Sequence, residues 1–414
     1  MSQMLLVSLI LFMIWGFFYY INRKKISSGK IYFLMLLCMI LPPTLNDEPL
    51  DKSWFHDVEL SNIAILALCL CAGFIPWLVF DKNIKGKRFQ INDDAVQVLK
   101  IFFTVLILWS LYSIIYLTPY AVRSLALGAH DTRNLLYSGK AEILPPNFLT
   151  TIAVAGSACY IYAILFFYMA CLSPQLKSYR IWLAMSSLSY LFNCLAFTAR
   201  DGLIFIPLLY LIFFLALKPS LNFKITQTIK KRILIIIASA FILLMTFSLS
   251  RFAGSGSKTD WASVYSGTFG YMNQQPYVFD ATIEGQDDFW GFEVRFPIIN
   301  RLIGIEEHEV NRRDNSFEWS FGTMYAEHYS AFGWLGLVLI TLVTVLFFGL
   351  GISNLFRRRR YFGAFMLFNV YCFISVSGMF YTRAGSNVSM NIFYLLLSFL
   401  PFFIPKWMSC KRIN

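Results

Sequence analysis

The feature that most constrains this chain is a succession of long apolar runs that extends over nearly all of its 414 residues. A helix that crosses a bilayer needs about 20 mostly apolar residues. Runs of this kind occupy residues 4–21, 31–45, 60–80, 97–118, 148–171, 180–197, 203–217, 233–249, 331–352, 361–381 and 387–405. We therefore expect an all-α fold, a polytopic integral membrane helix bundle of about 11 transmembrane helices that forms a single membrane domain over residues 1–414.

The composition excludes a soluble enzyme. Only 14% of the residues are charged and 57% are hydrophobic, whereas soluble domains have roughly 25% charged residues. A net charge of +12 would suggest nucleic-acid binding in a soluble protein, but in a membrane protein it indicates basic inner loops, so we expect no nucleic-acid partner. The eight cysteines have no zinc-site spacing with a nearby histidine. We expect no metal, no other cofactor and no disulfide framework.

The basic residues predict the orientation, because inner loops of membrane proteins are enriched in Lys and Arg. If the N-terminus is outside and the spans alternate, 23 of the 35 basic residues and only three of the 23 acidic residues lie inside. Every inner segment is then basic, including Arg357–Arg360 and the C-terminal tail. We therefore expect an outer N-terminus and an inner C-terminus.

The outer side then contains the residues suited to chemistry. Its longest segment is residues 250–330, between the eighth and ninth spans, and all four histidines lie outside. The inner loops are short, and none has a glycine-rich phosphate-binding pattern. We expect the functional site at the outer face and no nucleotide site at the inner face.

Three arginines lie at the outer ends of separate spans, against the bias of positive charge toward the inside. They are Arg200, which precedes Asp201 in a very short turn, Arg251 after the eighth span, and Arg383 in the last outer turn. A guanidinium binds phosphate oxygens in a bidentate manner and stays charged at physiological pH. The pattern favours convergence of the three on an anionic headgroup. Three independent interfacial arginines, or an Arg200–Asp201 pair that only caps helix ends, would give the same sequence.

The long outer segment has a composition that suits a carbohydrate. Between Phe252 and Glu327 it contains fifteen aromatic and twelve acidic residues. Aromatic faces stack on sugar rings and carboxylates accept hydrogen bonds from hydroxyl groups, although most of these aromatics would also serve as the small core of the loop. Its later part contains Arg312, Arg313 and Asp314, followed by Glu327 and His328 near the ninth span.

Three features of the chain point to one family. They are the Arg200-Asp201-Gly202 turn after the sixth span, the large outer loop before a late span, and the stretch from Phe321 to Gly336, in which Gly333-x-x-Gly336 begins the ninth span. With these features the chain resembles the O-antigen polymerase family, also called oligosaccharide repeat-unit polymerases (Wzy-type). The resemblance is architectural and covers nearly the whole chain. It implies a multi-pass protein of the bacterial inner membrane with a periplasmic N-terminus, a large periplasmic loop and a cytoplasmic C-terminus.

The resemblance also implies a reaction. A growing glycan would leave its undecaprenyl diphosphate and move to a sugar hydroxyl of a new lipid-linked repeat unit. Clustered arginines would stabilise the charge on the pyrophosphate without a metal. The implied partners are undecaprenyl-diphosphate-linked oligosaccharides and the lipid bilayer, and a chain-length regulator is a candidate protein partner.

The candidate site residues follow from this chemistry. The substrate-binding candidates are Arg200, Arg251 and Arg383, followed by Arg312 and Arg313. The candidates for accepting the proton of the acceptor hydroxyl are Glu327 and His328, followed by Asp314. A helix-end carboxylate with a solvated neighbour would produce the same Glu-His sequence.

Other functions remain open. An O-antigen ligase would have a similar loop and Gly-x-x-Gly pattern, but ligases place a histidine where this chain has Phe321–Met324. A glycosyltransferase that uses lipid-monophosphate sugars often has acids in its first outer loop, where this chain has Asp47, Glu48 and Asp51. A flippase or transporter of lipid-linked glycans would be expected to have charges in the middle of its spans, whereas here most of them lie at the boundaries.

Overall fold

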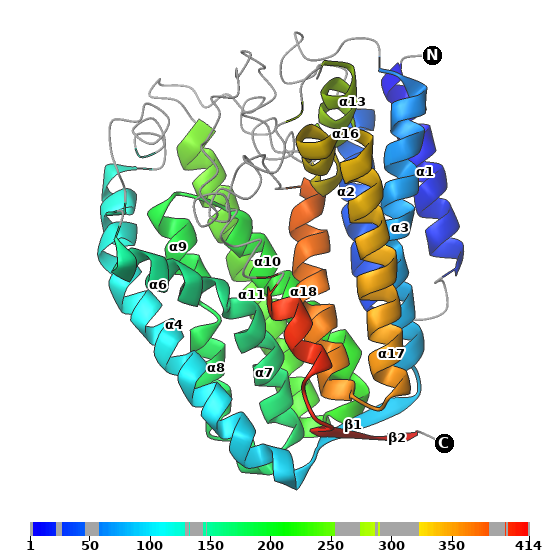
Figure 1. Cartoon of the computed structure of the whole chain (residues 1–414). Helices are drawn as coiled ribbons and strands as arrows, with labels where there is room; N and C mark the ends of the chain where they lie inside the picture. Colours follow the sequence, from blue (N-terminus) through cyan, green and yellow to red (C-terminus); the bar gives the residue numbers. More distant parts are fainter. Residues whose placement is uncertain are drawn as a thin grey trace, which may run out of the picture. The chain divides into compact units, whose positions relative to one another are not determined.

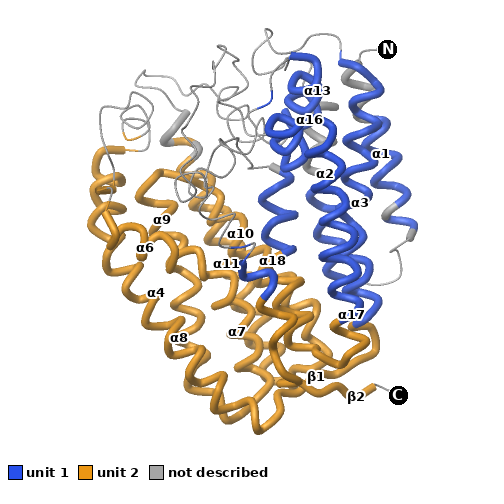
Figure 2. The backbone as a smooth tube through the Cα atoms, in the orientation of Figure 1, with its two compact units in different colours: residues 1–83, 265–354, 371–399 blue, residues 84–264, 355–370, 400–414 orange. Residues whose placement is uncertain are grey.

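The chain forms two compact units, each assembled from separate stretches of sequence (Figure 2). Unit 1 comprises residues 1–83, 265–354 and 371–399, and unit 2 comprises residues 84–264, 355–370 and 400–414. The computed structural model describes residues 3–21, 27–45, 58–128, 132, 144–145, 147–252, 274–285, 289, 323–380, 394 and 396–412, except for some side chains inside these ranges. Within these ranges the chain is helical nearly throughout (Figure 1).

One face of α4 (Asp93–Leu127) shows why these helices belong in a membrane. Its apolar side chains at seven-residue intervals are all exposed, Ile101 by 66%, Leu108 by 62%, Ile115 by 72% and Val122 by 59%. Residues at this spacing share one face of a helix, and soluble proteins rarely expose a continuous apolar surface. The stripe is about 30 Å long at about 1.5 Å per residue, which matches the hydrocarbon core of a bilayer.

The apolar runs form helices, which confirms a helical membrane fold. Five described helices are long and apolar enough to cross a membrane: Leu60–Ile84 (α3), Asp93–Leu127 (α4), Asp201–Ser220, Met324–Arg357 and Tyr361–Met379. A sixth is formed if α6 (Phe148–Ala158) and α7 (Tyr160–Leu172), which meet at an angle of 43°, count as one span. The total of eleven spans stays a prediction.

Unit 1 contains α1 (Gln3–Ile21), α2 (Ser28–Leu45), α3, α13 (Gln275–Gly285) and α16 (Met324–Leu342), and α16 continues into the π-helix η5 (Val343–Leu350). α1 packs against α2, and α13 packs against α16. The core is tied by buried tyrosines whose hydroxyl groups donate to carbonyl oxygens of α3: Tyr32 to Leu70 at 2.9 Å and Tyr325 to Cys69 at 2.7 Å. These bonds fix α2 and the first turn of α16 on α3.

Unit 2 contains α4, α6, α7, α8 (Tyr179–Ser186), α9 (Ser189–Ala196), α10 (Asp201–Leu217) and α11 (Phe223–Phe252). α4 packs along α9 and α6, and α10 packs against α11 and α7. α18 (Tyr361–Phe380) contributes its first ten residues to this unit and the rest to unit 1, and the end of α17 (Gly351–Arg357) also belongs to unit 2.

The span predicted over residues 180–197 is not one helix, because α8 ends at Ser186 and α9 begins at Ser189. The Ser187 hydroxyl lies 2.6 Å from the carbonyl oxygen of Ala184 and 2.9 Å from the hydroxyl of Tyr210. Serine side chains that bond to the backbone compete with the helical hydrogen bonds. The apolar pattern did not reveal this break, because both halves are apolar.

A short sheet at one end of unit 2 was also not predicted. β1 (Lys87–Ile91) pairs antiparallel with β2 (Met408–Arg412), so that residues more than 300 positions apart lie side by side. Phe89 N–H donates to Ser220 Oγ at 2.9 Å, and the Phe89 ring packs against Tyr361. Four segments predicted to be inner ones, around residues 87, 220, 360 and 410, therefore meet at the same end of this unit.

Candidate functional site

The predicted site residues fall into both units. Arg200 belongs to unit 2, whereas Glu327 and His328 belong to unit 1. Arg251 lies in the last turn of α11, but its side chain is outside the described part of the chain. Four further candidates lie outside the described residues altogether: Arg312, Arg313, Asp314 and Arg383. Convergence of the three boundary arginines therefore stays a prediction.

Asp201, the first residue of α10, is held by two side chains of the preceding helix. The Tyr190 hydroxyl donates a hydrogen bond to one carboxylate oxygen, and the Cys194 thiol donates to the other at 3.3 Å. Tyr190 is in turn stacked on Tyr160, with ring centroids 4.5 Å apart. The carboxylate therefore anchors α10 to α9, so a role as partner of Arg200 alone is an incomplete description.

The turn between α9 and α10 depends on a glycine and a strained threonine. A Cβ atom at Gly202 would lie 2.8 Å from Cys194 Sγ, so glycine allows the first turn of α10 to approach α9 closely. Thr198 has a φ of +49°, a region that β-branched residues rarely adopt, and its side chain is buried. Strain of this kind costs of order 1–3 kcal/mol and persists where neighbouring contacts impose it, often at functional sites.

Arg200 is the residue immediately before α10, and it is partly exposed. Its charge therefore lies at the N-terminus of an apolar span, where the first N–H groups and the helix dipole also favour an anion. The anchored Asp201 and the close approach at Gly202 fix the backbone that bears this guanidinium. The chemistry of this junction suits a phosphate group that reaches the end of the span.

In unit 1, Glu327 lies in the first turn of α16. Thr323 caps this helix, because its hydroxyl accepts a hydrogen bond from Ala326 N–H at 3.1 Å. A carboxylate in the first turn is stabilised by the helix dipole. Glu327 is only 4% exposed, so it is a buried helix-end carboxylate.

His328 follows with an ordered ring. Its Nδ1 lies 2.7 Å from the carbonyl oxygen of Met324. A carbonyl oxygen can only accept, so Nδ1 carries the proton and, in the neutral ring, Nε2 carries the lone pair. This tautomer is the one that a proton acceptor at Nε2 requires.

The Gly-x-x-Gly pattern is a sharp kink in α16. Gly333 has φ +60° and ψ −147°, a combination that is essentially restricted to glycine. At Gly336 a Cβ atom would overlap the carbonyl oxygen of His328, which the kink folds back onto this position. The two glycines therefore determine where the backbone of His328 lies.

Three aromatic side chains surround the kink. The Tyr329 ring contacts both Phe289 and Trp334 edge-on, with centroids 5.7 Å and 5.2 Å away, and the Phe289 ring also covers Gly333. Phe289 and Trp334 are about half exposed, whereas Tyr329 is buried. The cluster thus presents aromatic surface at the kink of α16, which follows Glu327 and His328 in the same helix.

Sequence analysis missed a group of acids on α13. Asn62 Nδ2 donates to Asp280 Oδ1 and to Glu284 Oε1, both at 2.9 Å, and Glu59 N–H donates to Asp280 at 3.1 Å. The two acids are four residues apart on α13, so they share one helix face. That spacing was the available signal, and it was hidden among the many acids of the loop.

Asp280 is unusual because it is only 6% exposed. Burial raises the pKa of this carboxyl above its ordinary value, and the charges of Glu284 and Glu59 raise it further, against the hydrogen bonds from Asn62 and from Glu59 N–H. A proton is therefore held more tightly here than on a solvated aspartate.

Neither a metal site among the described residues nor a match to a known protein indicates the function of this chain. Among the described residues, no group of three or more His, Cys, Asp or Glu side chains could hold a metal ion. No family model, no curated protein and no solved structure matches the chain.

Proposed function

We propose that this chain is a membrane polymerase that joins undecaprenyl-diphosphate-linked oligosaccharide repeat units into O-antigen or another surface polysaccharide at the periplasmic face of the bacterial inner membrane. The observation that carries the proposal is the α9–α10 junction. There the carboxylate of Asp201 is bonded to Tyr190 and Cys194 while the partly exposed Arg200 begins an apolar span. A guanidinium on this anchored backbone, at the end of an apolar span, suits a lipid-linked diphosphate better than a soluble substrate.

In the proposed reaction the bond between the anomeric carbon of the growing glycan and its phosphate oxygen breaks. The bonding electrons leave with the undecaprenyl diphosphate, whose developing charge Arg200 would stabilise. The acceptor hydroxyl of the next repeat unit forms the new glycosidic bond and gives its proton to a base. Glu327 and His328 are the described candidates for that base, and the tautomer of His328 suits the role.

Complementation of a deletion strain tests the proposal. Loss of the protein should leave surface glycan with single repeat units. Arg200→Lys keeps the charge but not the bidentate geometry, so we expect polymer to fall about tenfold or more. The matched control is Arg123→Gln, which removes an exposed arginine on α4 of the same unit and should leave the polymer normal.

Product length separates the polymerase from the ligase. Long glycan chains stranded on undecaprenyl diphosphate in the deletion strain would indicate a ligase. Normal surface glycan in that strain would contradict both enzymes. A lipid-monophosphate-dependent transferase would instead leave long chains that lack single sugars.

A transporter of lipid-linked glycans is the second candidate, because unit 2 contains two interrupted helical segments, α6–α7 and α8–α9. Discontinuous helices often form the substrate sites of transporters. If the protein is a transporter, its deletion should make repeat units accumulate on the cytoplasmic side. If it is a polymerase, repeat units should still reach the periplasm in the deletion strain. Labelling of lipid-linked glycan in intact cells and in inverted vesicles distinguishes the two.

A further inference from the structure

The β1–β2 ribbon of unit 2 places like charges opposite one another. Arg88 faces Lys411 across the strands, and Lys87 faces Arg412. Directly opposite residues of an antiparallel pair lie on the same face about 5 Å apart, and like charges there are destabilising. Arg88 and Lys411 are both exposed, so their charges lie together on the outward face.

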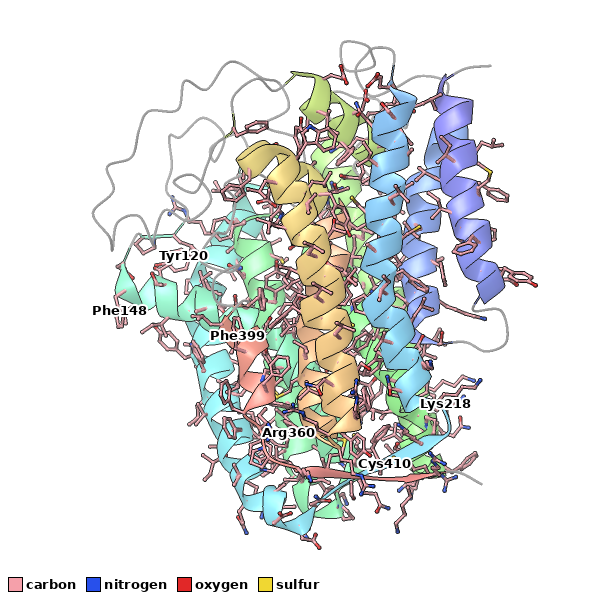
Figure 3. The ribbon with its side chains drawn as sticks, turned by 45° about the vertical axis from the view of Figure 1, so that its right-hand side comes forward. Tyr120, Phe148, Lys218, Arg360, Phe399 and Cys410 are labelled. Atoms are coloured by element: carbon pink, nitrogen blue, oxygen red, sulfur yellow. The ribbon has the colours of Figure 1, made fainter. Side chains whose placement is uncertain are left out.

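The inward face fixes the ribbon on the turn between α17 and α18. Phe89 packs against Tyr361 and Phe365, with centroids 5.5 Å and 5.2 Å away. Lys87 Nζ lies over the rings of Phe356 and Tyr361. The ribbon and this turn therefore form one surface, and Figure 3 shows Arg360 and Cys410 toward the same end of the unit.

The turn itself retains positive charge at a conformational cost. Arg359 has a φ of +58°, a position at the end of a helix where glycine is favoured. It is exposed, as are Arg357 and Arg358 before it. Backbone strain at Arg359 and like-charge pairing in the ribbon both destabilise this surface, and they are independent of each other. A bound anion would offset the repulsion between the like charges.

We propose that this basic surface, formed by Arg88, Lys411 and Arg357–Arg359, binds the headgroups of anionic phospholipids in the leaflet that it faces. The position of this surface, at the ends of apolar spans, favours a lipid as its partner. One apolar span ends with α17 and another begins with α18 at this turn. Arg360 in the turn donates to the carbonyl oxygen of Phe402, and the next residue, Phe403, is 79% exposed. The acids Asp93 and Asp94 begin α4 just after β1, and Asp93 already accepts a hydrogen bond from Gln175.

Lipid titration of the purified full-length protein in detergent tests this surface. Phosphatidylglycerol should raise the unfolding temperature at lower concentrations than phosphatidylcholine. Each basic side chain near a lipid surface contributes about 1 kcal/mol, so each charge removed should raise the half-maximal phosphatidylglycerol concentration about fivefold. We expect this for Arg88→Gln and Lys411→Gln, and their combination should abolish most of the lipid preference.

Arg359→Gly separates lipid binding from folding. Glycine suits the observed φ, so the variant should be at least as stable as the parent without lipid, yet respond less to phosphatidylglycerol. Arg123→Gln, at the other end of α4, should respond like the parent. Equal responses of the parent to the two lipids, or a double variant that responds like Arg123→Gln, would overturn the proposal.

Discussion

The α9–α10 junction of unit 2 and the start of α16 in unit 1 both contain a close contact at a glycine and a residue with positive φ, but they distribute these two features differently. Both begin an apolar helix beside candidate site residues. At the α9–α10 junction the glycine, Gly202, provides space and the strained φ falls on Thr198. In α16 glycines occupy both positions: Gly333 has the positive φ, and Gly336 makes the close contact. The first junction therefore stores conformational energy that the second does not.

The largest expected effect distinguishes the two close contacts. Gly336→Ala should destabilise the protein by about 3 kcal/mol, because the new methyl group meets the backbone of His328, which cannot rotate away. Gly202→Ala should cost about half as much, because it meets the side chains of Cys194 and Tyr190. Thermal unfolding in detergent measures both. Gly16→Ala is the control, since a Cβ atom there has no neighbour within 4 Å; equal losses at positions 202 and 336 would contradict the comparison.

The next effect tests the anchor of the α9–α10 junction. Asp201→Ala leaves the Tyr190 hydroxyl and the Cys194 thiol without their acceptor, which should cost about 2 kcal/mol. Asp201→Asn keeps one acceptor oxygen and should lose less. If the two variants unfold at the same temperature, the hydrogen bonds to α9 are not what holds the junction.

A smaller effect of opposite sign tests the strain. Thr198→Gly should stabilise the protein by about 1 kcal/mol, since glycine adopts a φ of +49° readily. Thr198→Ala retains a Cβ atom and serves as the matched control. If relief of this strain also lowers glycan polymer in cells, the strained turn contributes to function. A loss of stability in Thr198→Gly, relative to Thr198→Ala, would contradict the assignment of strain.

The smallest effect concerns Asp280, a buried carboxylate that accepts hydrogen bonds from Asn62 and from Glu59 N–H. Its pKa is raised in the folded protein, chiefly by burial, so the fold favours the protonated form. Its contribution to stability is greatest below the unfolded pKa and is lost as the pH rises through the folded pKa. We expect Asp280→Asn to be at least as stable as the parent at pH 7, with this advantage shrinking as the pH falls toward 4. An advantage that grows on acidification would contradict the raised pKa.

Sequence by itself determined where the long apolar helices of this protein lie. Apolar runs predict spans because burial in lipid depends on local composition, and the five long apolar helices follow those runs. The position of Arg200 at the end of an apolar run and the short turn before α10 were also readable, since charged and small residues interrupt the run.

Only the tertiary structure decided how those helices are interrupted and what surrounds each site residue. The Ser187 hydroxyl at the break between α8 and α9 bonds to the Ala184 carbonyl and lies 2.9 Å from the Tyr210 hydroxyl, and the β1–β2 ribbon pairs segments more than 300 residues apart. Neither leaves a local pattern. The bonds of Asp201 to α9 and the burial of Glu327 and Asp280 likewise depend on which elements pack together. Hydropathy records how apolar a residue is, but not which neighbour satisfies a polar one, and that is why these contacts required the fold.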